Sequence, residues 1–287
     1  MSIIEVKDLS FTYGIGTPFE KKAVDSLNLS INEGEVIGLI GHTGSGKSTF
    51  VQMLNGLIRP TGGTVLLDGK DIWEKPKQIR KIRFKVGMVF QYPEYQLFDE
   101  TVYKDISFGP KNKGLSESEI DETVRKAAKF VGLSDELLEQ SPFDLSGGEK
   151  RRAAIAGVIA MDPDVLVLDE PTAGLDPKGR KLLLSQIAQY HRERKNTIII
   201  VSHSMEDIAQ TTDRIIVMNH GKLEMFDTPK KVFSQVEKLE SMGLRVPEIT
   251  RIMLELKKEG YDVPSGILTV EQAFVEIVSL LKKEGKI

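Results

Sequence analysis

A glycine-rich segment, Gly41 to Thr49, combines the residue types that bind phosphate groups. It follows the apolar run Val36–Ile40 and fits the pattern G-x-x-x-x-G-K-[ST]. Glycines let backbone N–H groups turn toward one point, and the helix after the loop directs its positive end there. Lys47 supplies a charge for the β- and γ-phosphates, and Ser48 supplies an oxygen for Mg²⁺. The segment predicts a nucleoside triphosphate site built from Gly41, His42, Thr43, Gly44, Ser45, Gly46, Lys47, Ser48 and Thr49.

Two carboxylates, Asp169 and Glu170, end the apolar run Val165–Leu168. A buried strand that ends beside a phosphate loop places the first carboxylate on Mg²⁺, directly or through water. The second then faces an attacking water as a general base. The same pair also occurs at the start of ordinary loops. Together with the phosphate loop it predicts hydrolysis of a nucleoside triphosphate with Mg²⁺, because hydrolysis needs both a metal ligand and a base.

The composition is that of an ordinary globular protein, with 287 residues, a formal net charge of −3 and intermixed acidic and basic residues. This balance argues against nucleic-acid binding, which usually needs a basic patch. The absence of cysteine excludes disulfides, thiolate zinc sites and cysteine nucleophiles. No run approaches the roughly 18 apolar residues that span a bilayer, and the N-terminus lacks the layout of a signal peptide. We therefore expect a cytosolic protein whose link to any membrane goes through a partner.

Short apolar runs alternate with helix-length segments, which is typical of a mainly parallel sheet covered by helices. The residues up to Tyr13 indicate a small antiparallel layer, with turns at 14–18 and 32–34. Strand signals vanish between about 92 and 160, where Ser116 and Glu119 form a capping box, so we expect a helical insertion. The predicted buried strands are Val36–Ile40, Val86–Phe90, Val165–Leu168, Thr197–Val201 and Arg214–Met218.

The last part of the chain has a different character. Pro247 favours the start of one helix, and Thr269 with Gln272 favours the cap of another. We expect a large α/β domain over 1–226, with the helical subdomain at about 92–160, and a small helical domain over 227–287.

Five further segments, in order with the two above, resemble the ABC ATPase family over roughly Ile3 to Phe226. They are Tyr13, Gln91, Leu145–Glu149, Ala173–Asp176 and His203. The resemblance implies the α/β P-loop NTPase fold of ABC ATPases, with an N-terminal antiparallel β layer, a helical subdomain insertion and here a small helical C-terminal domain.

The resemblance also implies roles for these residues. Tyr13 stacks on adenine, Gln91 senses Mg²⁺ and water, and His203 contacts the γ-phosphate. The signature residues Ser146, Gly147, Gly148 and Glu149, with Asp176 of the D-loop, complete the nucleotide site of an opposite subunit. The implied catalytic residues are therefore Glu170, His203, Gln91 and Lys47, and the implied metal ligands are Ser48, Gln91 and Asp169.

Within the family, the segment Gln91–Phe98 is similar to the energy-coupling-factor and cobalt-importer ATPases, most of all to the second of two paralogous ATPases. That resemblance implies a homodimer or a heterodimer with a paralogue. It further implies a transmembrane coupling subunit that docks near Pro93–Phe98, a substrate-binding membrane subunit, and uptake of vitamins or of cobalt or nickel ions. The protein would then act at the cytoplasmic face of the cell membrane. The C-terminal helices would serve ATPase–ATPase contacts or pack on their own domain.

Two other functions remain open at this stage: an exporter ATPase and a non-transport ATPase acting on nucleic acid or ribosomes. The stretch from Thr49 to Leu145 is too short for the long coiled coil that the second class usually carries.

Overall fold

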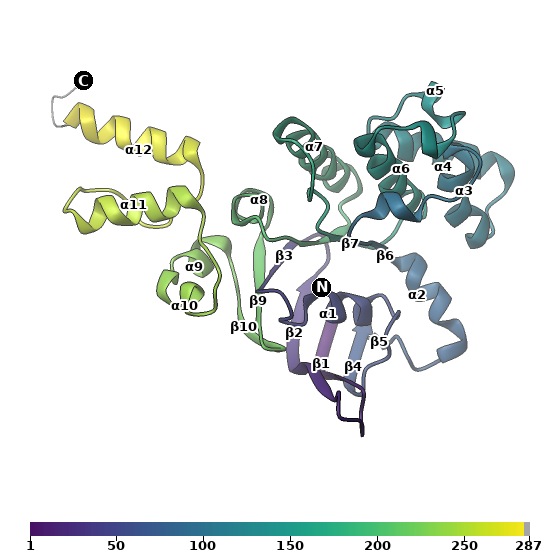
Figure 1. Ribbon diagram of the computed structural model, residues 1–287, viewed down its shortest axis with the longest axis horizontal. Helices are drawn as coiled ribbons and strands as arrows, with labels where there is room; N and C mark the ends of the chain where they lie inside the picture. Colours follow the sequence, from purple (N-terminus) through teal and green to yellow (C-terminus); the bar gives the residue numbers. More distant parts are fainter. Residues whose placement is uncertain (284–287) are drawn as a thin grey trace.

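A six-stranded sheet runs through the middle of the computed structural model, which describes residues 1–283 (Figure 1). Its strand order is β10-β9-β3-β8-β7-β6, and all strands are parallel except β10, which pairs antiparallel with β9. The predicted strands are confirmed to within one residue at each end, whereas β10 was not predicted. The bounds are β3 Val36–Ile40, β6 Val86–Val89, β7 Val165–Asp169, β8 Thr197–Val201, β9 Arg214–Asn219 and β10 Lys222–Asp227.

The central strands are apolar throughout because both faces of this sheet are covered. Successive side chains of a strand point to opposite faces. In β3, Ile37 and Leu39 accordingly pack in one core cluster, and Val36 and Ile40 pack in the other. This buried sheet fixes where the loops at its carboxyl edge lie.

A second, antiparallel sheet has the order β2-β1-β4-β5. The predicted N-terminal layer is confirmed, and it also includes two strands that the sequence analysis missed. Helix α1 (Lys47–Leu54) contributes Phe50 and Met53 to the core cluster that both sheets share, so it is held between them. The bounds are β1 Ser2–Tyr13, β2 Lys21–Asn32, β4 Gly62–Leu67 and β5 Lys70–Asp71.

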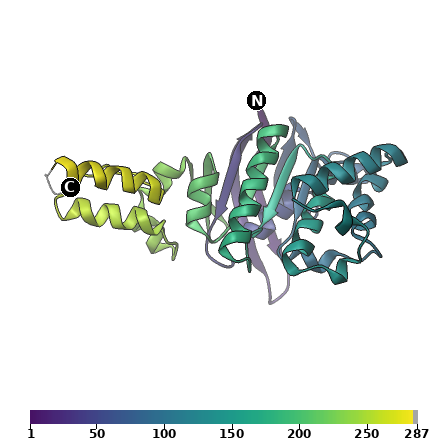
Figure 2. The ribbon, with the colours of Figure 1, turned by 90° about the horizontal axis from the view of Figure 1, so that it is seen from above.

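A layer of helices follows β6 and lies to one side of the central sheet (Figures 1 and 2). The predicted capping box is confirmed, since Ser116 and Glu119 satisfy each other's backbone N–H groups at the start of α4. The bounds are η1 Pro76–Gln78 and α2 Ile79–Lys85 before β6, then η2 Pro93–Gln96, α3 Val102–Lys113, α4 Glu117–Phe130, α5 Asp135–Leu138, η3 Pro142–Asp144 and α6 Gly147–Ile159.

The remaining helices are α7 Pro177–Arg194, α8 Met205–Thr211, α9 Pro229–Phe233, α10 Val236–Ser241, α11 Glu248–Lys258 and α12 Val270–Lys283. Helices α9 and α10 share the large core cluster, whereas α11 and α12 enclose a small cluster of their own around Met253. This pair projects from the end opposite the helical layer (Figure 2). Both predicted helix starts are confirmed: Pro247 is the N-cap of α11, and the N–H of Gln272 donates to Thr269 Oγ1 at 3.2 Å.

Within residues 1–283, no helix is long and apolar enough to cross a membrane.

Candidate active site

The phosphate loop is the turn from β3 into α1, and close backbone approaches determine its shape. A Cβ at Gly41 would meet the carbonyl oxygen of Met218. Gly46 has φ 103°, and a Cβ there would meet the carbonyl oxygen of Ala23. The N–H of Gly221, in the β9–β10 turn, donates to the carbonyl of Ser45 at 2.9 Å. Glycine is therefore required at two positions where neighbouring strands press against the loop.

Lys47 is buried under the loop that it follows. Its Nζ donates to the carbonyl of Gly41 at 2.7 Å and to that of His42 at 3.1 Å. Burial lowers the pKa of Lys47, and the nearby carboxylates of Glu170 and Asp169 offset part of this effect. The ammonium group thus lies inside the loop, facing two carboxylates, where it can bind a phosphate oxygen.

The carboxylates at the end of β7 lie beside this lysine. Burial raises the pKa of Asp169, while Lys47 and a hydrogen bond from Ser48 oppose the shift. Burial also raises the pKa of Glu170 from 4.5 to about 7. Glu170 has a left-handed backbone, with φ 52°, and its Oε1 is buried with no hydrogen-bond partner among residues 1–283. A carboxylate with a strained backbone, one unpaired oxygen and a pKa near neutrality has the properties of a general base.

His203 completes this group from the loop after β8. Its Nε2 lies 3.5 Å from Glu170 Oε1, and its side chain is half exposed. Burial and the charge of Lys47 lower the pKa of His203, which favours its neutral imidazole. The carboxyl edge of the sheet therefore brings Lys47, Asp169, Glu170 and His203 together from three strands.

Tyr13 lies at the end of β1, next to the phosphate loop. Its hydroxyl and Thr49 Oγ1 are 3.1 Å apart. Its ring packs edge-on against Phe11, with 4.7 Å between centroids, and remains partly exposed. The predicted aromatic contact for a base is thus positioned from the second sheet, by a residue far from the loop in sequence.

The segment Leu145–Glu149 lies at the start of α6, in the helical layer and away from α1 (Figure 1). Ser146 is the N-cap: it accepts from the N–H of Glu149 at 3.4 Å, and Glu149 Oε2 accepts from the N–H of Ser146 at 2.9 Å. Hydrogen bonds from Ser146 lower the pKa of Glu149. Gly147 is exposed, and a Cβ there would meet nothing within 4 Å. This helix N-terminus is therefore open to an anion, but not one bound in the same chain's phosphate loop.

Comparison with known proteins identifies the chain. Residues 24–173 match the family described as ABC transporter. An energy-coupling factor transporter ATP-binding protein EcfA2 from Caldanaerobacter subterraneus is 53% identical, covering 97% of this chain and 98% of the relative. One from Clostridium tetani is 52% identical, covering 98% of both. The chain belongs to this family of ABC transporter ATPases. It is an ATP-binding protein of the energy-coupling factor type.

Solved structures agree with this assignment. CbiO1 from Clostridium perfringens, part of the ABC transporter complex CbiONQ, has a TM-score of 0.75 and 40% identity, covering 88% of this chain and 99% of that one. The ATP-binding cassette MJ0796, in a dimeric post-hydrolysis state with ADP and phosphate, has a TM-score of 0.71 and 28% identity. The match covers 79% of this chain and 98% of that one. The predicted ABC ATPase fold is thereby confirmed.

In this ABC ATPase, the sequence-derived site residues divide into two groups. The first, around the phosphate loop, contains Tyr13, Lys47, Ser48, Asp169, Glu170 and His203. The second lies in the helical layer and at the start of α7. It includes Ser146 and also Asp176, which caps α7 by accepting from the N–H of Gly179 at 2.6 Å. Gln91 is exposed and lies directly after Phe90, before η2. The sequence-derived residues of this ATPase therefore lie in two separate groups.

The sequence analysis missed two polar clusters of the ATPase, both near the catalytic edge. Arg151 on α6 pairs with Glu94 and donates to the carbonyls of Pro171 and Ala173. Arg180 on α7 donates through Nε to both oxygens of Asp207, each at 2.9 Å. Their partners are 57 and 27 residues away in sequence. No local spacing signals such pairs, so only the fold reveals them.

Proposed function

We propose that this ATPase powers an energy-coupling-factor importer that takes up vitamins or cobalt or nickel ions. It would act from the cytoplasmic face of the cell membrane, bound to a transmembrane coupling subunit that works with a substrate-binding membrane subunit. The observation that carries the proposal is an apolar groove at the junction of the nucleotide-binding sheet and the helical layer. This groove is where movement of the ATPase would be passed to a membrane partner.

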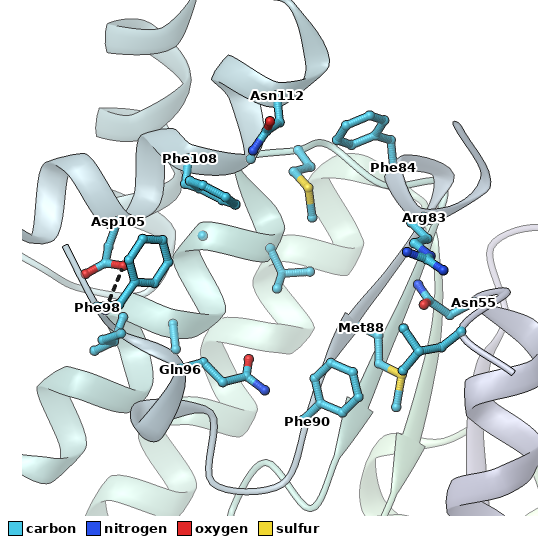
Figure 3. Close-up of a pocket in the computed structure, with 18 of the residues that line it drawn as sticks. Asn55, Arg83, Phe84, Met88, Phe90, Gln96, Phe98, Asp105, Phe108 and Asn112 are labelled. Carbon is cyan, nitrogen blue, oxygen red and sulfur yellow. Dashed lines mark hydrogen bonds between the residues drawn. The ribbon is translucent and has the colours of Figure 1, made fainter. Parts of the chain in front are cut away.

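The groove has a volume of about 520 Å³ and opens between α2 and β6 on one side and α3 and α6 on the other (Figure 3). Phe98 and Phe108 form part of its wall, with ring centroids 5.2 Å apart in an edge-to-face contact. Both rings are largely exposed. The lining also includes Phe84, Met88, Phe90, Leu97, Ala153 and Val158, with Arg83 and Asp105 among the polar members.

The segment predicted to dock, Pro93–Phe98, lines one edge of this groove through its last three residues, Gln96–Phe98. Asp105 holds its end: it accepts from the N–H of Phe98 at 3.2 Å, drawn as a dashed line in Figure 3, and from that of Asp99 at 3.1 Å. An apolar trough with a few charged residues at its rim suits an amphipathic helix. We infer that such a helix, from the coupling subunit, occupies the groove beside Gln91.

The open N-terminus of α6 supports the second part of the proposal, a dimer of ATPases. Each phosphate loop would face the Ser146–Gly148 segment of the other subunit. The helices α11 and α12 supply a further surface, because Phe274 and Val275 on α12 are each about two-thirds exposed. Exposing these apolar side chains to water does not stabilise a monomeric ATPase, whereas a contact with another protein would bury them. We propose that they contact the second ATPase, identical or paralogous.

The donor set at the phosphate loop fits Mg²⁺. Ser48 is exposed at the first turn of α1 and hydrogen-bonds to Asp169, so a hydroxyl and a carboxylate oxygen lie side by side. Mg²⁺ typically takes one or two protein oxygens and completes its shell with water and substrate phosphates. When bound, the ion would neutralise charge on the phosphates. The chain's own residues bind the phosphate through Lys47, position water through His203 and accept its proton at Glu170.

The docking proposal can be tested by co-expressing the ATPase pair with the coupling and substrate-binding subunits. Phe98→Glu places a charge in the apolar groove, so we expect it to abolish co-purification with the membrane subunits. ATP binding by the isolated protein should stay within about twofold, because the loop is untouched. Tyr261→Glu, at a somewhat less exposed aromatic beyond α11 and outside the groove, is the control and should co-purify normally. Normal assembly of Phe98→Glu would refute this docking site.

A further inference from the structure

One ion pair, between the buried Arg151 and the partly buried Glu94, joins three segments of the ATPase that each contribute to its site or its docking surface. Arg151 lies in the second turn of α6 and is 3% exposed. Its Nη2 donates to Glu94 Oε1 at 2.8 Å, and its Nε donates to Glu94 Oε2 at 3.2 Å. Glu94 belongs to η2, the short helix at the edge of the docking groove. Both oxygens of the carboxylate are thus held by one planar guanidinium.

The remaining guanidinium nitrogen of Arg151, Nη1, contacts the backbone after Glu170 instead of Glu94. Nη1 donates to the carbonyl of Pro171 at 3.4 Å and to that of Ala173. Pro171 directly follows Glu170, and the N–H of Ala173 donates back to the carbonyl of Glu170 at 3.2 Å. The guanidinium therefore connects η2 to the backbone turn that carries the general base.

The Arg151–Glu94 pair cannot easily adjust when one of its segments moves. A guanidinium is rigid, and it is always charged in proteins. A buried charge that loses its partner is costly, whereas the intact pair is compensated. Movement of η2 must therefore either carry Arg151 along or break the pair, and either event alters the contacts of the Pro171–Ala173 backbone. The Pro171–Ala173 backbone would therefore respond to movement of η2 in one step rather than gradually.

We propose that Arg151 is a positioning residue that links the state of the docking segment to the geometry of Glu170. When the membrane partner fixes η2 through the groove, Glu94 fixes Arg151, and Arg151 fixes the turn that aims the Glu170 carboxylate. This link is separate from the exposed Gln91, and it rests on the proposed docking of a membrane subunit at Pro93–Phe98. Its role is to make hydrolysis depend on the partner.

The test compares the ATPase activity of the assembled transporter with that of the ATPase pair alone, for wild type and variants. Glu94→Gln removes the charge but keeps the shape. The double variant Glu94→Leu with Arg151→Met removes both charges at similar volume, which usually preserves folding. Asp121→Asn, which breaks an exposed ion pair with Arg125 on α4, is the matched control.

We expect both test variants to co-purify with the membrane subunits and to keep KM for ATP within about twofold, while kcat of the assembled transporter falls about tenfold. The activity of the ATPase pair alone should change much less. A third variant, Arg151→Lys, keeps the charge and should therefore retain part of the stimulation by the membrane subunits that the other two variants lose. Asp121→Asn should behave as wild type.

Two results would overturn the link. One is full stimulation by the membrane subunits in both variants. The other is an equal loss of activity in the assembled and isolated forms, with a raised KM, which would mean that the pair only supports the fold. If the wild-type chain itself did not co-purify with membrane subunits, the proposed function would fail and this link with it.

Discussion

The raised pKa of Glu170 gives the most direct test of the hydrolytic site. Its carboxylate is only 12% exposed, and burial raises its pKa from 4.5 to about 7. A shift of this size corresponds to roughly 3 kcal/mol against the charged form. As a general base, Glu170 must be deprotonated before it can accept a proton from water. Hydrolysis should therefore increase with pH across this pKa.

The expected size follows from the titration. A carboxylate with a pKa of about 7 is about one-tenth ionised at pH 6 and about nine-tenths ionised at pH 8. The value of kcat/KM, which reports groups of the free enzyme, should thus rise about tenfold between these pH values. If the pKa of Glu170 were 4.5, kcat/KM would be almost constant between these pH values. Burial and the charge of Lys47 lower the pKa of His203, which favours its neutral imidazole.

The assay is phosphate release by the assembled transporter at saturating Mg²⁺ and variable ATP. Glu170→Gln should reduce kcat by about 10² to 10⁴-fold while preserving ATP binding and ATP-driven dimers. Its ATP affinity, measured over the same pH range, serves as the control for pH effects on binding. A flat kcat/KM profile in wild type, or near-normal turnover of Glu170→Gln, would refute the assignment of the base.

Three further predictions concern stability and binding. Because the folded pKa of Glu170 lies above its unfolded value, ionisation costs stability as pH rises from about 4.5 to 7, and the full cost persists above. Glu170→Gln should therefore raise the melting temperature at pH 8 but not at pH 4.5, and equal shifts at both pH values would contradict this origin. Gly46→Ala should weaken ATP binding at least about tenfold, because φ 103° and the Ala23 carbonyl both oppose a Cβ; equilibrium titration checks this, with Gly243→Ala, at an open position of positive φ outside the site, as a comparison. Asp207→Asn should lower the free energy of unfolding by about 2 kcal/mol, because Arg180 loses its charged partner; an unchanged denaturant midpoint would show that the pair is dispensable.

Much of the fold could be predicted because the relevant signals are local. The continuous apolar runs such as Val165–Leu168 predicted the parallel strands, since a strand covered on both faces has no polar side. Ser116 and Glu119 predicted a helix start, because a capping box involves residues three apart. Strands β4 and β10 were missed. Both are only partly buried, so neither carries a continuous apolar run. The partner of β4 is the distant β1, whereas β10 pairs with the neighbouring β9.

The features of the candidate site likewise divide into those with a local sequence signal and those that tertiary contacts create. The order and spacing of Gly41–Thr49, Asp169–Glu170 and Leu145–Glu149 determined that the chain binds and hydrolyses a nucleotide, because each motif carries its own chemistry. The sequence did not reveal the buried Arg151–Glu94 pair or the raised pKa of Glu170. Burial and partners distant in sequence create these properties, and only tertiary structure sets them. It is also the fold that separates Ser146 from the phosphate loop, because the start of α6 lies in the helical layer while α1 lies between the two sheets.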